Sequence, residues 1–239
     1  MVEVLEARDV GPLGDGIGSV TLLDHMGDDL AVVNAARVSF NKEAKWKIRP
    51  DVWRKAGVLD QKDIALLNYL AIHNHWTPFG HPQLKFRIKA PLFVAREWYR
   101  HTVGFIRSEV SGRYVTADKE FYVPTEWRMQ AKRKKQGSSD EVAEGSHAYW
   151  GAALDMANQA LGYYQTLIED GVAAEQARTI LPQSMYTEFV ETGSLAAYAR
   201  LYGLRAAPDA QLETRKYAEA VGGLISPLFP ETWSLLTHA

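Results

Sequence analysis

The sequence of 239 residues contains no cysteine. Disulfide bonds, thiolate zinc sites and a cysteine nucleophile are therefore excluded. Basic and acidic residues nearly balance at a net charge of −2, which argues against a protein that binds nucleic acid through its overall charge. No stretch approaches the roughly 20 consecutive apolar residues of a transmembrane helix, and the N-terminal residues lack the basic and apolar regions of a signal peptide. We expect a cytoplasmic protein without membrane or nucleic-acid partners.

Common nucleotide loops and metal motifs are also missing. There is no G-x-G-x-x-G or Walker sequence, which disfavours a Rossmann or P-loop site. The histidines do not combine with carboxylates at the short helical spacing of a zinc or di-iron site, so we expect no metal. The basic segment 128–135 could contact RNA, but in a chain of balanced charge a solvated connector is the better interpretation.

Hydrophobic periodicity predicts separated strands and helices around a sizeable core, since 46% of residues are apolar. Residues 83–89 alternate between apolar and basic side chains, which is typical of a half-buried strand. The expected strands are 1–10, 18–26, 83–89 and 184–191. The expected helices are 30–38, 60–74, 91–103, 147–169, 173–181, 195–202 and 210–226, with Gly104 and Gly203 as stops. Because strands and helices do not alternate regularly, the pattern predicts an α+β fold.

Segments 96–102 and 108–114 hold three arginines, a histidine, two glutamates and two serines among aromatic residues. Guanidinium groups bind phosphate with paired donors and stack on flat rings, and the backbone of a Ser-x-x-Ser-Gly loop can form an anion nest. The pattern indicates a site for a phosphorylated ligand with a flat ring. An ion-pair network, Glu97 with His101 and Glu109 with Arg113, is an equally open alternative.

Two further arginines, Arg178 and Arg205, lie in mostly apolar surroundings. A buried arginine requires an anionic or planar polar partner. Taken singly, each could instead be an arginine whose head reaches solvent at a helix end.

Together these segments resemble the flavin-dependent thymidylate synthase family. The signature of that family is Arg-His-Arg, a gap of seven or eight residues, then Ser. Here it is Arg100-His101-Thr102, eight residues, then Ser111. Further blocks in family order are 35–40, 75–81, 89–96, 177–182, 204–206 and 210–211. The resemblance runs from about residue 28 to the C-terminus, and such ordered blocks are far more specific than one motif.

The resemblance implies a single domain over 1–239, with a mixed, mostly antiparallel sheet, packed helices and polar insertions near 41–59 and 128–147. It implies reductive methylation of dUMP to dTMP. Methylenetetrahydrofolate would supply the carbon, and FAD, reduced by NADPH, would supply the hydride. No protein cysteine attacks the pyrimidine in this family, which fits the cysteine-free chain. A homotetramer with shared active sites is implied as well.

Site residues follow by position. Arg205 matches the arginine that helps ionise N3 of the pyrimidine, a role that suits a fixed cation beside a ring amide. The implied dUMP-binding residues are Glu97, Arg100, Glu109, Val110, Ser111, Gly112, Arg113, Arg178 and Arg205. The implied flavin-binding residues are Ser39, Thr77, Arg100, His101, Thr102, Glu109, Ser194 and Arg200. No metal ligand is implied.

Several positions depart from the family pattern, mainly on the flavin side. Thr102 replaces the third signature residue, an arginine, and Glu97 stands where the family often has glutamine. Arg107 or Arg200 could return the charge missing at Thr102. The departures keep two alternatives open: a related folate- and flavin-dependent enzyme with another outcome at C5, such as hydroxymethylation, and a relative that binds nucleotide or flavin without turnover.

Overall fold

The structure is a computed structural model that describes residues 9–48, 57–113, 119–131 and 137–237. Its main sheet has the strand order β1–β2–β5–β9–β6, and every neighbouring pair is antiparallel. The strands are β1 (Asp9–Val10), β2 (Ser19–Met26), β5 (Gln83–Pro91), β6 (Phe105–Glu109) and β9 (Tyr186–Ser194). Helices pack on this sheet, so the predicted α+β class and the mostly antiparallel sheet are confirmed.

The remaining elements are helical or form two small ladders. The helices are α1 (Asp29–Arg37), α2 (Gln61–Ile72), α3 (Leu92–Trp98), α4 (Ser146–Glu169), α5 (Ala174–Ala177), α6 (Leu195–Arg205), α7 (Leu212–Ile225) and α8 (Pro230–Thr237). Short 3-10 turns are η1 (Val38–Phe40), η2 (Thr77–Gly80) and η3 (Arg178–Ile180). The ladders are β3 (Lys47–Ile48) with β4 (Gly57–Val58), and β7 (Arg128–Gln130) with β8 (Ser138–Val142).

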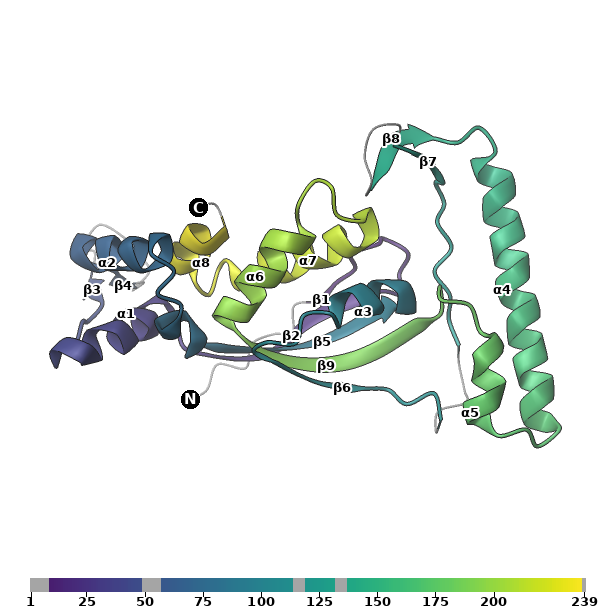
Figure 1. Ribbon diagram of the computed structural model, residues 1–239, viewed down its shortest axis with the longest axis horizontal. Helices are drawn as coiled ribbons and strands as arrows, with labels where there is room; N and C mark the ends of the chain where they lie inside the picture. Colours follow the sequence, from purple (N-terminus) through teal and green to yellow (C-terminus); the bar gives the residue numbers. More distant parts are fainter. Residues whose placement is uncertain (1–8, 49–56, 114–118, 132–136, 238–239) are drawn as a thin grey trace.

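The core lies between the sheet and the helices α3, α6 and α7, which cover one of its faces (Figure 1). On β5 the predicted alternation is observed, because Leu84, Phe86 and Ile88 are buried while Lys85 and Arg87 are exposed. The ring of Phe86 packs edge-on against Tyr198 of α6, with ring centroids 5.2 Å apart. Burial of these side chains gives α6 a fixed position over β9 and β5.

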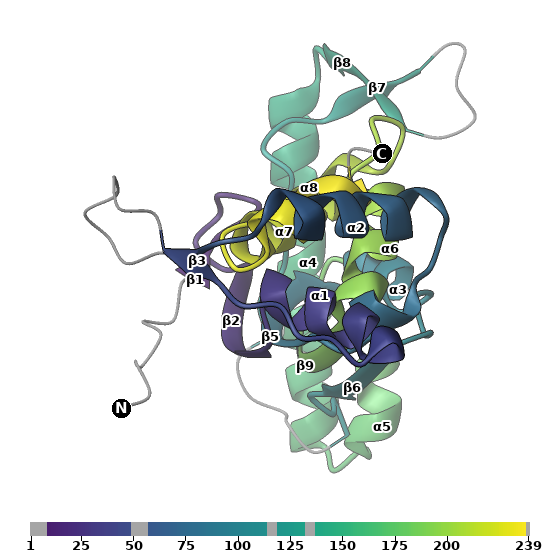
Figure 2. The same ribbon diagram turned by 90° about the vertical axis from the view of Figure 1, so that its left-hand side faces the viewer.

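Helices α1, α2 and α8 gather at one end of the sheet (Figure 2). The sequence analysis did not predict α8. Its first turn is held by the buried Asp29 of α1, whose carboxylate accepts hydrogen bonds from the backbone N–H groups of Glu231 and Thr232, both at 3.0 Å. A carboxylate at a helix N-terminus satisfies otherwise unpaired N–H groups, so a long-range contact starts this helix.

Three predicted helix boundaries are wrong, and the first of them changes the geometry of the signature. The predicted helix 91–103 ends at Trp98, because the chain turns through Val103 and Gly104 to pair as β6 with β9. Gly104 lies in that turn with a φ of +84° and does not end a helix. Helix α6 continues through Gly203 to Arg205. The predicted helix 173–181 is α5 followed by η3.

Segment 128–147 differs from the expected connector, because 128–130 and 138–142 form the ladder β7–β8. Residues 49–56 of segment 41–59 and residues 1–8 of the predicted strand 1–10 lie outside the described residues. Within the described residues, no helix is both long and apolar enough to cross a membrane.

Candidate functional site

Arg205, the last residue of α6, is held by the last turn of α3 and by the segment that follows it. Its Nη1 group donates to Glu97 Oε2 at 3.2 Å, and its Nη2 group donates to the Glu97 carbonyl oxygen at 3.0 Å. Its Nε group donates to His101 Nε2 at 3.0 Å. A guanidinium has five N–H donors, so two donors of Arg205 remain beyond these three bonds. The expected pair between Glu97 and His101 is replaced by a joint contact of both residues with Arg205.

Arg205 lines a cleft of about 910 Å³, in the size range of small-molecule sites. Glu97 and Arg100 line the same cleft. Its lining also includes Arg128–Gln130, Gly137 and Ser138 of the β7–β8 ladder, and residues of the loop between α6 and α7. A cation held at fixed geometry in a cleft can stabilise negative charge that develops on a ligand.

The imidazole of His101 is uncharged at neutral pH. Burial lowers its pKa to about 4, and the nearby guanidinium groups of Arg205, Arg107 and Arg200 act in the same direction. A neutral Nε2 can accept the proton shared by Arg205 Nε, whereas a protonated Nε2 could not. The neutral state of His101 is therefore consistent with its hydrogen bond from Arg205.

Arg107 forms an ion pair with the fully buried Glu191 of β9. Trp98 Nε1 also donates to Glu191, at 3.1 Å. Burial raises the pKa of Glu191, while Arg107 and Trp98 favour its charged form. The guanidinium of Arg107 also lies over the rings of Phe105 and Tyr99, with distances of 4.9 and 5.4 Å to the ring centroids. Arg107 therefore stabilises the sheet. Because its guanidinium is already paired with Glu191, it is poorly placed to replace the positive charge that is missing at Thr102.

The turn between Thr102 and Gly104 packs on the start of α6. The Oγ atom of Ser194 accepts from the Ala197 N–H at 3.2 Å and caps α6. Arg200 Nη2 donates to the Val103 carbonyl oxygen at 2.9 Å. A Cβ atom added at Gly104 would lie 2.9 Å from Ala197 Cβ, so only glycine permits this close approach. Thr102, Ser194 and Arg200 thus lie around one turn.

The second half of the signature lies at the far end of β6. Glu109, the last residue of β6, accepts a hydrogen bond from Thr187 Oγ1 at 2.7 Å. After Val110, Ser111 Oγ accepts from the Arg113 N–H at 3.3 Å and tightens the loop. Gly112 lies beside Arg178 of η3, since an added Cβ would be 3.4 Å from Arg178 Cδ. This cluster offers guanidinium, hydroxyl and backbone N–H donors suited to an anion.

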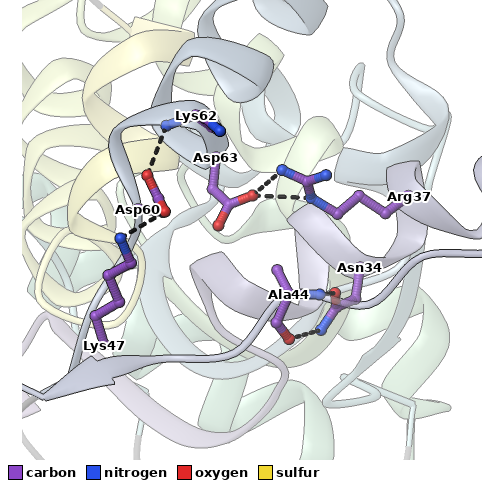
Figure 3. Close-up of polar contacts among 7 residues, drawn as sticks. All are labelled: Asn34, Arg37, Ala44, Lys47, Asp60, Lys62 and Asp63. Atoms are coloured by element: carbon purple, nitrogen blue, oxygen red, sulfur yellow. Dashed lines mark hydrogen bonds and ion pairs between the residues drawn. The ribbon is translucent and has the colours of Figure 1, made fainter.

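Ser39 and Thr77 lie at the end of the sheet that carries α1 and α2. Ser39 follows α1 in η1, and Thr77 begins η2. Figure 3 shows what holds the segment beyond η1: Asn34 bonds both backbone groups of Ala44, at 2.7 and 3.2 Å, and Arg37 pairs with the buried Asp63 of α2. These contacts tie the segment after η1 to α1, and α1 to α2.

The sequence analysis missed the cleft wall formed by the β7–β8 ladder. Arg128 Nε donates to Ser138 Oγ at 2.6 Å, and Arg128 Nη2 donates to Glu213 Oε1 of α7 at 2.8 Å. Burial opposes ionisation of Glu213, but the bonds from Arg128 and Gln211 prevail and lower its pKa. The sequence could not predict this contact. Arg128 belongs to a basic segment of the chain, and its partner Glu213 lies 85 positions away.

The family model described as thymidylate synthase complementing protein matches residues 21–231. The chain is 40% identical over 218 residues to a flavin-dependent thymidylate synthase of Thermus thermophilus, covering 91% of this chain and 74% of that protein. It is 37% identical over 217 residues to the flavin-dependent thymidylate synthase of Thermotoga neapolitana, covering 90% and 89%.

Solved structures give the same result. The UMP/dUMP methylase PolB of Streptomyces cacaoi, bound with 5-Br UMP, matches with a TM-score of 0.77 and 28% identity, covering 92% of this chain and 94% of that one. The complex of PolB with 5-Br dUMP matches with a TM-score of 0.74, 29% identity and the same coverage. By sequence and by fold, the chain belongs to the flavin-dependent thymidylate synthase family.

Proposed function

We propose that this protein methylates C5 of dUMP to give dTMP, with FAD as its flavin, methylenetetrahydrofolate as carbon donor and NADPH as reductant. The observation that carries the proposal is the fixed guanidinium of Arg205 in the 910 Å³ cleft, with Arg100 beside it. Family membership supports the same reaction.

Arg205 is the proposed catalytic residue. With three donors bound by Glu97 and His101, the guanidinium cannot swing away, and its remaining donors can meet a ring oxygen or nitrogen. A cation beside N3 of the pyrimidine favours the anionic ring and so makes C5 more nucleophilic. This route activates the substrate without a covalent bond from the protein, as a chain without cysteine requires.

The phosphate of dUMP is assigned to the second cluster, with Ser111, Gly112, Arg113 and Arg178. Its hydroxyl, guanidinium and backbone N–H donors suit a phosphate, which prefers several directional donors. Glu109 and Val110 border this loop and complete the proposed nucleotide site. In this assignment dUMP uses groups from both clusters.

The proposed site is therefore shared between copies of the chain in a homotetramer. The long helix α4 lies at the edge of the molecule beside α5 (Figure 1). Tyr149, Met156 and Tyr163 follow one another at seven-residue spacing along α4 and are 52%, 71% and 68% exposed. Side chains at this spacing share one helix face. An exposed apolar stripe of this kind supports association with further copies.

The groups around Trp76 and the turn at Gly104 fit a flavin. A hollow of about 470 Å³ is lined by Trp76, Gly104, Phe105 and Ser194, among others, and the indole of Trp76 is 64% exposed. An exposed aromatic face suits a flat ring system. The polar groups assigned to the cofactor are Ser39, Thr77, Arg100, His101, Thr102, Glu109, Ser194 and Arg200. A reduced flavin, when bound, would supply the hydride for the methyl group.

The decisive experiment is a product assay under anaerobic conditions. Purified protein would be incubated with FAD, NADPH, methylenetetrahydrofolate and either dUMP or UMP, and the nucleotide masses would be measured. We expect dTMP from dUMP, with Arg205→Ala as the inactive control. A hydroxymethyl product would favour the related C5-modifying activity, and unchanged dUMP with bound flavin would favour a binding protein. Faster conversion of UMP would move the substrate assignment toward that of PolB.

A further inference from the structure

We propose that Glu97 and His101 are positioning residues that lock the Arg205 guanidinium in the cleft, and that the lock requires an uncharged His101. The inference rests on the proposed function, because Arg205 is the group that it positions. It gives Glu97 and His101 a task beyond the ligand contacts that the family resemblance implies for them.

The lock joins two parts of the fold. Glu97 lies in the last turn of α3, His101 follows three residues after that helix ends, and Arg205 ends α6. Glu97 uses both its carboxylate and its carbonyl oxygen, so it binds two arms of the guanidinium, while His101 binds the third nitrogen. All three guanidinium nitrogens are thereby fixed. An arginine has several rotatable bonds, and fixing it in advance avoids the entropy cost of ordering it during the reaction.

His101 is surrounded by cations. The charged groups that face it are Arg205 and Arg200 from α6 and Arg107 from β6, while Glu97, in the preceding helix, is paired with Arg205. The imidazole accepts through Nε2, which leaves the proton on Nδ1. Protonation of Nε2 would remove the acceptor and place a positive charge against Arg205. The cations around His101 therefore protect the acceptor form that the lock requires.

Glu97 contributes geometry and charge, and the two can be separated. Glu97→Gln keeps an oxygen that can accept from Arg205 Nη1, and it leaves the carbonyl bond in place. Glu97→Ala removes the side-chain bond. If positioning dominates, the glutamine variant keeps kcat within about threefold of wild type, whereas the alanine variant loses about 10-fold or more. A merely structural carboxylate would affect protein stability and flavin content in both variants without this split in kcat.

His101 permits the same separation. In His101→Gln the amide reaches about as far as Nε2, and its oxygen can accept from Arg205 without titrating. His101→Ala has no acceptor. We expect about a 10-fold loss of kcat in the alanine variant and substantial rescue in the glutamine variant. The matched control is His73→Gln, because His73 lies on the exposed end of α2 and its ring packs against Tyr69; its kinetics should equal those of wild type.

A second measurement tests the lock without turnover. In protein labelled with ¹⁵N-histidine, the His101 signal is assigned by its loss in His101→Gln and followed between pH 5 and 8. We expect an unprotonated Nε2 throughout this range, and a pKa that rises toward the ordinary value of about 6.5 in Arg205→Ala. Protonation of wild-type His101 near pH 6.5, or no response to the loss of Arg205, would overturn the inference.

The two proposals fail in different ways. If wild type forms dTMP but all variants of Glu97 and His101 retain full kcat, the positioning roles are wrong and the proposed function stands. If wild type forms no dTMP, the proposed function is wrong, while the histidine spectrum still shows whether Arg205 is locked by His101.

Discussion

The two halves of the signature, Arg100-His101-Thr102 and Ser111, are separated by eight residues and are built in different ways. The first half, Arg100 to Thr102, lies beside Arg205, and His101 bonds that arginine directly. The second half, around Ser111, lies beyond the five-residue strand β6 and beside Arg178. An extended strand of this length spans roughly 13–17 Å. The first half completes its contacts with α3 and α6, whereas the second is the proposed phosphate loop.

The two halves differ because their proposed tasks differ: activation of the ring for the first and binding of the phosphate for the second. A cation that activates a ring must be fixed, and Arg205 is fixed by contacts within its own subunit. A phosphate-binding loop must remain open to its ligand, and the loop around Gly112 lies beside the exposed Arg178. In the proposed tetramer, the two halves serve one site only when groups from different copies are combined.

The largest expected effect concerns the strand that separates the halves. Glu191→Ala should lower the free energy of unfolding by about 3–5 kcal/mol, because the largely buried Arg107 side chain, 14% exposed, would lose its carboxylate partner. Denaturant unfolding measures the change. Glu188→Ala is the matched control on the same strand, since its contact with Arg87 is exposed at 3.6 Å and should contribute at most about 1 kcal/mol. Equal losses in both variants would show that the buried pair does not fix β6.

Arg205→Ala breaks the first half. Removal of one group that stabilises developing charge typically lowers kcat by about 10²–10³-fold, and we expect a loss of this size. FAD absorbance should remain, because the fold around Trp76 does not depend on Arg205. Single-turnover measurement of dTMP formation, at saturating dUMP, gives the comparison. Full activity in this variant would remove Arg205 from the catalytic role.

The sequence predicts those features that local contacts decide, and it fails where contacts join residues far apart in the chain. The alternation at Leu84, Phe86 and Ile88 predicts β5 correctly, because local burial decides it. The sequence analysis predicted one helix over 91–103, but pairing of β6 with β9 turns the chain after Trp98. Family resemblance selected the site residues. It could not reveal that Glu97 bonds Arg205, since that contact joins residues 108 positions apart.

Ser111→Ala and Arg178→Ala weaken the second half. Each removes one donor from the proposed phosphate loop, and a hydrogen bond to a charged group contributes about 1.5–3 kcal/mol. We expect KM for dUMP to rise roughly 10- to 100-fold, with kcat close to that of wild type because Arg205 is untouched. Steady-state kinetics and calorimetric dUMP binding would test this. A loss confined to kcat would contradict the binding assignment.

The smallest expected effect is a partial recovery of activity in mixed oligomers. It would test directly whether one site combines the two halves from different chains. Arg205→Ala and Arg178→Ala chains with different affinity tags would be co-expressed, and oligomers carrying both tags purified. At a dUMP concentration where neither variant turns over alone, mixed oligomers should form dTMP, because a site can take Arg205 from one chain and Arg178 from another. Arg205→Ala combined with Arg205→Gln is the control, since both chains fail in the same half. Recovery only in the first mixture supports sites shared between subunits, whereas inactivity of both mixtures would mean that each chain supplies both arginines to its own site.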